Sequence, residues 1–181
     1  MKLLLYCTKS KNKYDRLVRD EHYGNPFYLY GAITENFESL NGKIVAECDF
    51  EVERIDYRSA ELLFNRHYLE VLDKSCLTDK EMYDYLKGEN GYAIHIKNLH
   101  IFDEPIKLEK CHNDDFSSVV NYAPQNMMYS WLFTDKWNRY ALISIQPQWL
   151  YKILNGEKTI EIRKKILKGM MGWQVKKRWI N

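Results

Sequence analysis

The order of apolar and polar residues along the chain predicts six β-strands. Residues 43–53 are apolar at first and then alternate with acidic residues, which is typical of a half-buried strand. A similar alternation covers residues 92–102, and Asp103-Glu104-Pro105 is expected to end that strand. The predicted strands are residues 2–7, 43–53, 92–102, 128–133, 140–145 and 159–163.

Apolar residues at helical spacing, together with capping signals, predict three helices. Thr78 and Glu81 have the spacing of a capping box and begin the second helix. Pro147 suits the first turn of the third helix, and Asn155-Gly156 suits its end. The predicted helices are residues 59–72, 78–88 and 147–156.

These elements predict a compact α+β domain. Five to six strands with two to three flanking helices are typical of a small closed β-barrel. We expect residues 1–165 to form this single domain and residues 166–181 to form a basic tail. Residues 134–139 are expected to link two neighbouring strands.

The composition narrows the class of protein. The chain has 181 residues, of which 45% are hydrophobic and 14% aromatic, which excludes a disordered chain and allows one core. No apolar run approaches the ~18 residues of a transmembrane helix. The run at residues 2–7 stops at Thr8-Lys9, short of the apolar core of a signal peptide. We therefore expect a cytoplasmic protein with no membrane partner.

The net charge of +2 hides an uneven distribution. Residues 151–181 contain nine Lys or Arg against two Glu, whereas residues 1–150 contain 18 Lys or Arg against 23 Asp or Glu. A basic end that carries Trp173 and Trp179 can contact phosphate and stack on bases. The alternative is a solvated basic terminus.

Cysteine and histidine give no sign of a metal centre. The four cysteines contain no C-x-x-C pair, and the five histidines are scattered along the chain. We expect reduced, structural cysteines, no metal and no cofactor.

The segment after the third predicted helix carries the strongest chemical signal. Glu161 and Arg163 are two residues apart on a predicted strand, so they share a face and can pair. Lys158 precedes them just after the turn, where an irregular backbone can bring it to the same cleft. A cleft lined by these groups suits an anion or a polar nucleobase. The alternative is a surface strand with one ion pair of little energetic weight.

The same segment resembles the opening of an ASCH domain, whose signature is G-x-K-x-x-E-x-R. Gly156, Lys158, Glu161 and Arg163 fill its four positions. Further segments resemble other parts of that family: residues 6–9 (YCTK), 40–47 (LNGKIVAE), 92–96 with the exit 103–105, and 123–126 (APQN), which resembles a closing P-P-Q loop. The resemblance implies a PUA-like β-barrel.

The order of these segments differs from the family. The signature segment opens an ASCH domain, but here residues 140–165 follow all the other matching segments. The first interpretation is a circular permutation within one chain, because the natural ends of a domain often lie close together. The second is a homodimer in which this segment completes a neighbouring chain. The third is a truncated second copy of the domain.

The resemblance implies a module that binds RNA or a nucleotide or nucleoside, since PUA-like domains bind RNA or modified bases. Lys158, Glu161 and Arg163 would line the ligand cleft, and a base would stack on an aromatic ring. The further ligand-binding residues implied by the matching segments are Tyr6, Thr8, Lys9, Gln125 and Ser144, and the candidate stacking rings are Tyr6, Tyr28, Tyr30 and Trp149.

A small hydrolase acting on a modified nucleoside or on RNA, amidohydrolase- or nuclease-like, is the alternative. The amidohydrolase pattern in the family uses a Lys, a Thr three residues later and a distant Glu. Here Lys158 matches, but Glu161 stands where the Thr is expected. In this alternative Lys158 is the base, with Glu161 and Glu47 as candidate catalytic carboxylates. A structural or interaction protein from a mobile element is the third class.

Overall fold

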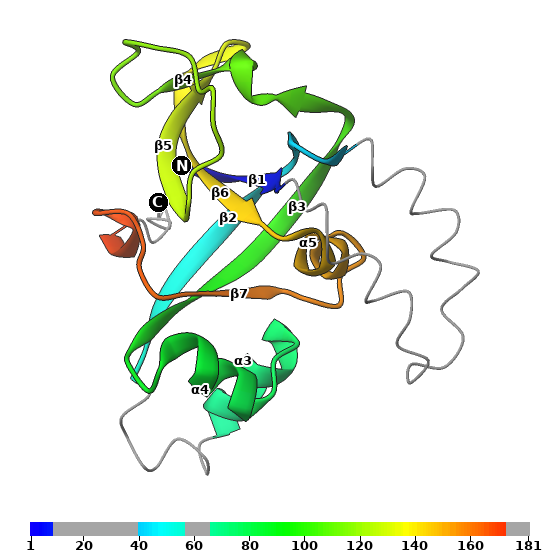
Figure 1. Cartoon of the computed structure of the whole chain (residues 1–181), viewed down its shortest axis with the longest axis vertical. Helices are drawn as coiled ribbons and strands as arrows, with labels where there is room; N and C mark the ends of the chain where they lie inside the picture. The colour runs from blue at the N-terminus through cyan, green and yellow to red at the C-terminus, as the bar shows by residue number, and fades with distance from the viewer. Residues whose placement is uncertain (9–39, 57–65, 173–181) are drawn as a thin grey trace, which may run out of the picture.

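The computed structural model describes residues 1–8, 40–56 and 66–172. These residues form one seven-stranded sheet, in the order β4-β5-β6-β1-β2-β3-β7, with three α-helices (Figure 1). The strands are β1 (Lys2–Cys7), β2 (Lys43–Ile55), β3 (Gly91–Lys107), β4 (Cys111–Asn113), β5 (Met127–Leu132), β6 (Asp135–Ile145) and β7 (Ile160–Arg163). The helices are α3 (Arg66–Ser75), α4 (Asp79–Leu86) and α5 (Pro147–Leu154), with short 3-10 turns η2 (Leu108–Lys110) and η3 (Met170–Gly172). The α+β class is confirmed.

Strand β1 lies at the centre of the sheet. It pairs antiparallel with β2 and parallel with β6. Leu3 and Leu5 are buried in one apolar cluster and Leu4 in another, because neighbouring side chains of a strand point to opposite faces. The predicted strand at residues 2–7 is therefore confirmed, and all of its residues after Lys2 are buried.

The sheet is open, so the predicted small barrel is not confirmed. Strand β4 lies at one edge and β7 at the other, and the two do not pair. Side chains nevertheless connect the β7 end of the sheet to β5 and β6. Three side chains donate hydrogen bonds to backbone carbonyls across this gap: Arg163 donates to Ser144, Asn126 donates to Lys165, and Tyr129 donates to Lys168.

The predicted end of the third strand at Asp103-Glu104-Pro105 is wrong, because β3 continues to Lys107. Ala46 of β2 pairs with Ile101 of β3, and Ile44 pairs with Ile106. Between these two pairs β3 has more residues than β2, and the extra residues form a bulge. Pro105 lies in this bulge, where its missing N–H interrupts no regular ladder bond.

Strand β6 is longer than predicted, and β4 was not predicted. The predicted link 134–139 belongs largely to β6, since Arg139 lies opposite Trp131 and Tyr140 lies opposite Ser130. Strand β4 escaped the hydrophobic pattern because it has three residues, of which His112 and Asn113 are polar.

Helices α3 and α4 cover one side of β7, and α5 lies on its other side (Figure 1). The capping box is confirmed, because Thr78 Oγ1 accepts from the Glu81 N–H and the Glu81 carboxylate accepts from the Thr78 N–H. The first predicted helix is confirmed from residue 66 onward and runs on to Ser75, while residues 59–65 lie outside the described part of the chain. Ile160 and Ile162 pack with buried side chains of α3 and α4.

The beginning of the predicted tail is part of the packed fold. Met170 is buried in the main apolar cluster, and Ile166 and Leu167 pack against it. Residues 173–181, with Trp173 and Trp179, lie outside the described residues. The four cysteines are free, and burial raises the pKa values of Cys7, Cys48 and Cys111 to about 12. Among the described helices, none has the length and apolar character needed to traverse a bilayer.

Candidate functional site

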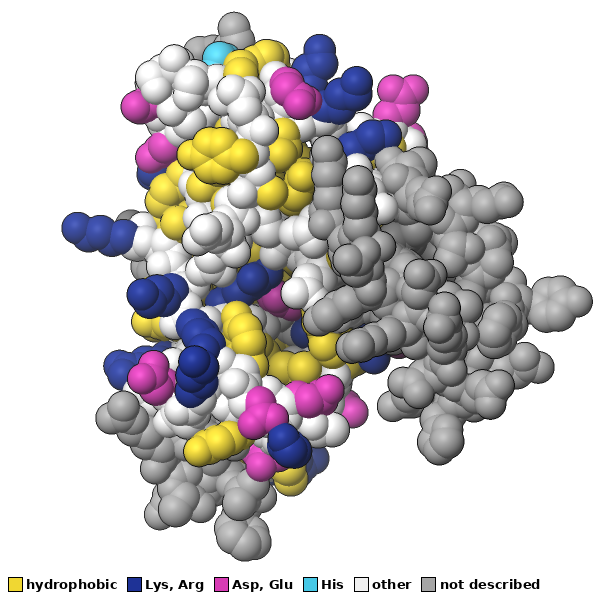
Figure 2. Space-filling view, in the orientation of Figure 1, with side chains coloured by type: hydrophobic (Ala, Val, Ile, Leu, Met, Phe, Trp, Pro, Cys, Tyr) yellow, Lys and Arg dark blue, Asp and Glu magenta, His cyan; other side chains and the backbone are white. Residues whose placement is uncertain are grey.

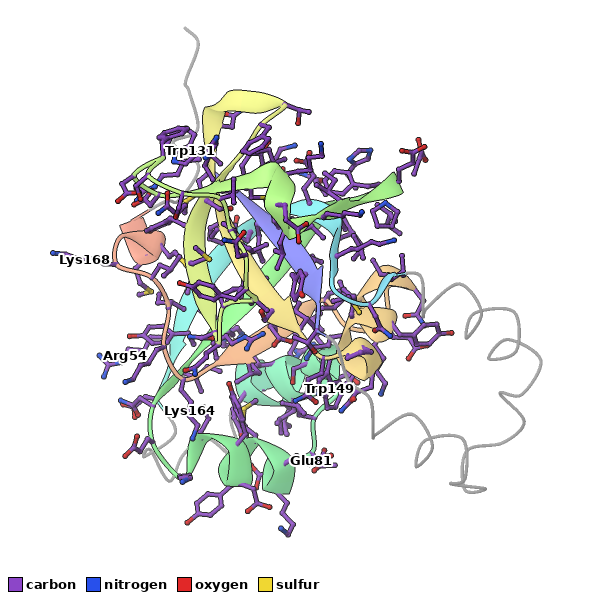
Figure 3. All side chains as sticks on the ribbon, turned by 45° about the horizontal axis from the view of Figure 1, so that its top comes forward. Arg54, Glu81, Trp131, Trp149, Lys164 and Lys168 are labelled. Carbon is purple, nitrogen blue, oxygen red and sulfur yellow. The ribbon has the colours of Figure 1, made fainter. Side chains whose placement is uncertain are left out.

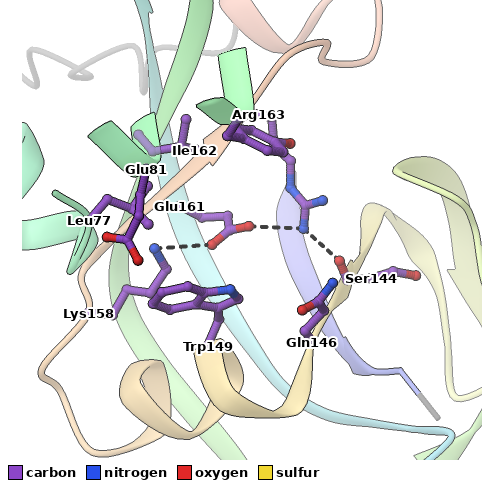
Figure 4. A pocket seen from close by; sticks show the side chains of 10 residues that line it. Leu77, Glu81, Ser144, Gln146, Trp149, Lys158, Glu161, Ile162 and Arg163 are labelled. Atoms are coloured by element: carbon purple, nitrogen blue, oxygen red, sulfur yellow. Dashed lines mark hydrogen bonds and ion pairs between the residues drawn. The ribbon is translucent and has the colours of Figure 1, made fainter. Parts of the chain in front are cut away.

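A cleft of about 270 Å³ lies where β7 runs between α4 and α5. Its size is close to the lower limit of roughly 300 Å³ for small-molecule pockets. Figure 4 shows Lys158, Glu161 and Arg163 in a row across it, with Trp149 of α5 beside them. The lining residues are Leu77, Glu81, Tyr85, Ser144, Gln146, Trp149, Lys158, Glu161, Ile162 and Arg163.

The turn between α5 and β7 places Lys158 at the cleft. Gly156 has φ of 82°, in the left-handed region that glycine adopts without strain. The chain then folds back, so that the Lys158 N–H donates to the Lys152 carbonyl and the Thr159 N–H donates to the Lys74 carbonyl of α3. These bonds fix the backbone of Lys158 before β7 begins at Ile160. The direction of the Lys158 side chain is therefore not set by the rule that neighbouring side chains of a strand point to opposite faces.

The Lys158 side chain is almost fully buried, with 2% of its surface exposed. Its Nζ donates to the carbonyl of Ser75 at the end of α3, at 2.6 Å. It also lies 3.4 Å from Glu161 Oε2 and 5.1 Å from the centre of the Trp149 ring. Burial lowers the pKa of Lys158 from its ordinary value, and the negative charge of Glu161 opposes that shift.

Glu161 and Arg163 form a second buried pair, as the two-residue spacing predicted. Arg163 Nη2 lies 3.0 Å from Glu161 Oε1, and the two side chains are 11% and 10% exposed. The same Nη2 donates to the carbonyl of Ser144 at 2.6 Å. The Nε of Arg163 is buried and has no hydrogen-bond partner among the described residues. The interpretation as a solvent-exposed strand with one ion pair is therefore wrong.

The cleft has one aromatic ring on each of the two helices that border it. Trp149 of α5 is half-buried, and Tyr85 of α4 is exposed. Lys164, just after β7, holds its ammonium 5.4 Å from the centre of the Tyr85 ring. The arrangement offers apolar ring surface beside a row of charged hydrogen-bonding groups, which suits a flat, polar ligand.

The cleft contains some of the residues proposed from sequence and not others. Ser144 lines it, and the Ser144 hydroxyl donates to the Pro124 carbonyl. Gln125 follows Pro124 and is exposed, but it does not line the cleft. Tyr6 is buried in the apolar cluster that contains Leu4 and Leu142, where burial raises its pKa, and it does not line the cleft, so it does not offer a stacking surface there.

Three further candidates are not part of this cleft. Thr8 donates its backbone N–H to the Ile145 carbonyl next to the cleft but does not line it. Glu47 lies on β2, where it pairs with Lys2, two strands away from β7. It therefore does not join Lys158 as a catalytic carboxylate. Lys9, Tyr28 and Tyr30 lie outside the described residues.

The contribution of α4 to the site was missed by sequence reasoning. Glu81 and Tyr85 line the cleft although more than 70 residues separate them from Lys158. The capping box predicted the helix but not its position against β7, which depends on the packing of Met82 and Leu86 with Ile160 and Ile162. The part of the chain that the structure describes holds no group of three or more His, Cys, Asp or Glu residues placed to bind a metal ion.

Comparison of the chain with family models, curated proteins and solved structures finds no match.

Proposed function

We propose that this cleft binds a nucleobase, carried by RNA or by a nucleotide or nucleoside, and that the chain is a binding module of the ASCH type. The observation that carries the proposal is the buried row of Lys158, Glu161 and Arg163 beside Trp149. Lys and Arg donate hydrogen bonds and Glu accepts them, which matches the mixed donors and acceptors on the edge of a base. The Trp149 ring supplies a stacking surface.

The position of the signature residues supports the ASCH resemblance. Lys158, Glu161 and Arg163 all line one cleft, and Gly156 forms the turn that leads into it. Strand β6 pairs with β1, and β7 pairs with β3, within the same chain. These pairings support a PUA-like fold in circularly permuted order. The four free cysteines are in keeping with a cytoplasmic protein.

Calorimetric titration with a panel of nucleosides and 5′-mononucleotides, including base-modified ones, tests the proposal. The informative variant is Lys158→Met, which removes the charge, keeps most of the volume and leaves Glu161 paired with Arg163. We expect the wild type to bind at least one compound and Lys158→Met to bind it at least about 10-fold more weakly. Lys107→Met, on the exposed end of β3, is the matched control.

Two results would overturn the proposal. One is that no nucleobase compound binds to the wild type. The other is that Lys158→Met binds as tightly as the control while both variants keep the wild-type melting temperature. Because Lys158 also bonds the end of α3, the melting temperature is measured for each variant before binding is compared.

A hydrolase is the second candidate, and the lowered pKa of Lys158 is the observation that favours it. A lysine with a lowered pKa has a larger neutral fraction near pH 7 and can accept a proton. Against this, the amine already donates to Ser75, and Thr159 does not line the cleft. Incubation with acylated nucleosides and RNA tests this candidate: turnover that Lys158→Met abolishes would support it, and no turnover across the panel would exclude it.

A further inference from the structure

Three exposed lysines follow the cleft directly along the chain. Lys164, Lys165 and Lys168, here called the lysine track, come immediately after Arg163 in a stretch with no acidic residue. None of the three forms an ion pair with a described residue. The lysine track touches the cleft itself, because the Lys164 ammonium lies 5.4 Å from the ring centre of the cleft residue Tyr85.

The backbone of the lysine track is held against the sheet. Asn126 donates to the carbonyl of Lys165 at 2.8 Å, and the hydroxyl of Tyr129 donates to the carbonyl of Lys168 at 2.7 Å. Ile166 and Leu167, between these two points, pack against the main apolar cluster. The three lysine side chains therefore extend into solvent from a backbone that is held in place by hydrogen bonds and apolar packing.

Figure 2 shows several Lys and Arg side chains along the left of this face, where Figure 1 places the segment that follows β7. Asp and Glu side chains are numerous over the helices at the bottom of the same view, and a further group of Lys and Arg side chains lies at the upper right. Figure 3 labels Lys164, Lys168 and Arg54 on this same side, away from Trp149. Helix α4, which also borders the cleft, carries the acidic residues Asp79, Glu81 and Asp84.

We propose that the lysine track binds the phosphates of a single-stranded polynucleotide whose base occupies the cleft. The inference rests on the proposed function and extends it: the ligand is a strand rather than a free nucleoside. Helix α4 carries three acidic residues against one lysine, Lys80, whereas the lysine track carries positive charge only. A polyanion is therefore favoured along the lysine track rather than along α4. The four residue-to-residue steps from Lys164 to Lys168 reach at most about 14 Å, which at roughly 3.4 Å per stacked nucleotide corresponds to about four nucleotides.

The test compares a strand with a monomer. The strand is a labelled, mixed-sequence, single-stranded RNA of about a dozen nucleotides, with a DNA of the same sequence as a second arm. The monomer is the nucleoside that binds best in the panel above, since a nucleoside carries no phosphate for the lysine track to bind. The variant carries Lys164→Ser, Lys165→Ser and Lys168→Ser, and the matched control carries Lys97→Ser, Lys107→Ser and Lys110→Ser, none of which lines the cleft.

We expect the lysine-track variant to lose strand affinity and to keep the monomer affinity of the wild type. Each phosphate contact adds about 0.7 to the slope of log affinity against log salt for a single strand, so the slope should fall by about 2. Between 50 and 200 mM salt, the wild-type affinity should then drop roughly 15-fold more than that of the variant. A difference between the RNA and DNA arms assigns the strand type.

The inference fails if no strand binds more tightly than the monomer, or if the lysine-track variant and the control show equal strand affinity and equal salt slopes. These results can be distinguished from failure of the proposed function. If the proposed function is wrong, the monomer does not bind to the wild type, or Lys158→Met binds the monomer as tightly as the wild type does.

Discussion

The guanidinium of Arg163 joins two strands that are not neighbours in the sheet. Its Nη2 donates to the carbonyl of Ser144, near the end of β6, while Arg163 itself is the last residue of β7. The same nitrogen pairs with Glu161. The Arg163 side chain thus fixes the position of the Glu161 carboxylate and connects the edge strand β7 to β6.

Replacing Arg163 by alanine should lower the free energy of unfolding by about 3 kcal/mol, because it leaves the buried Glu161 carboxylate with only the longer contact to Lys158. Urea unfolding measures this. The control is Arg139→Ala, which breaks the exposed pair with Asp114 and the contact with the Tyr129 ring and should cost no more than about 1.5 kcal/mol. Equal losses in the two variants would contradict the role assigned to Arg163.

Trp149 should contribute to ligand affinity by stacking. Removal of an aromatic ring that stacks on a base costs about 1–3 kcal/mol, so Trp149→Ala should bind the nucleobase ligand about 5- to 150-fold more weakly. Trp149→Phe should retain part of the affinity and lose the quenching of tryptophan fluorescence on ligand binding. Trp131→Phe, on β5 and outside the cleft, should keep both affinity and quenching. If Trp131→Phe rather than Trp149→Phe removes the quenching, the stacking site is elsewhere.

The capping box of α4 should matter for both stability and binding. Thr78→Ala removes the hydroxyl that accepts from the Glu81 N–H, and it should cost about 1 kcal/mol of unfolding free energy. The affinity for the ligand should fall as well, since α4 carries the cleft residues Glu81 and Tyr85. Thr78→Ser keeps an accepting hydroxyl and should restore both quantities. A Thr78→Ser variant as weak as Thr78→Ala would argue against capping as the cause.

The stability of the protein should fall at alkaline pH. Folding raises the pKa of the Cys48 thiol from 9.0 to about 12 by burial, so above pH 9 the unfolded state releases a proton that the folded state retains. Stability from this group is complete below pH 9 and is lost as the pH rises toward 12. In urea unfolding from pH 8 to 11, Cys48→Ala should reduce the downward slope by up to about 1.4 kcal/mol per pH unit. An unchanged slope would contradict the burial of a neutral thiol.

Lys158 should act in the opposite direction in the same titration. Its pKa is lowered on folding, so the folded state pays a penalty for the charge at neutral pH, and the penalty disappears as the pH rises toward the ordinary lysine pKa of 10.5. Relative to Lys158→Met, the wild type should gain stability over that interval. A wild type that loses stability relative to Lys158→Met would mean that the charged amine is favoured by the fold.

The anchoring of the lysine track can be tested without changing its charge. Tyr129→Phe removes the hydrogen bond to the Lys168 carbonyl and keeps the ring that Arg139 covers. It should cost about 1 kcal/mol of stability and speed amide hydrogen exchange around residues 166–170. Exchange that remains at the wild-type rate would show that this bond does not hold the segment.

Local sequence patterns were sufficient to predict most helices and strands, and also the Lys158, Glu161 and Arg163 side of the cleft. The capping box placed the beginning of α4, and the two-residue spacing of Glu161 and Arg163 correctly predicted that they share a face and pair. These features depend on neighbours in the sequence, where backbone geometry alone fixes which side chains meet. Strand β3 shows the limit of this reasoning, because Pro105 signals a break but its position in a bulge depends on the pairing with β2.

The sequence by itself determined most of the strands, the capping box of α4 and the chemical character of the segment from Gly156 to Arg163. Only the tertiary structure decided that the sheet stays open, that α4 borders the cleft, and that Glu47 and Tyr6 lie away from it. It also decided that Lys158 is buried against the end of α3. The reason is physical: spacing along a chain fixes the direction of a side chain, whereas burial and contacts across dozens of residues follow from how complete elements pack together.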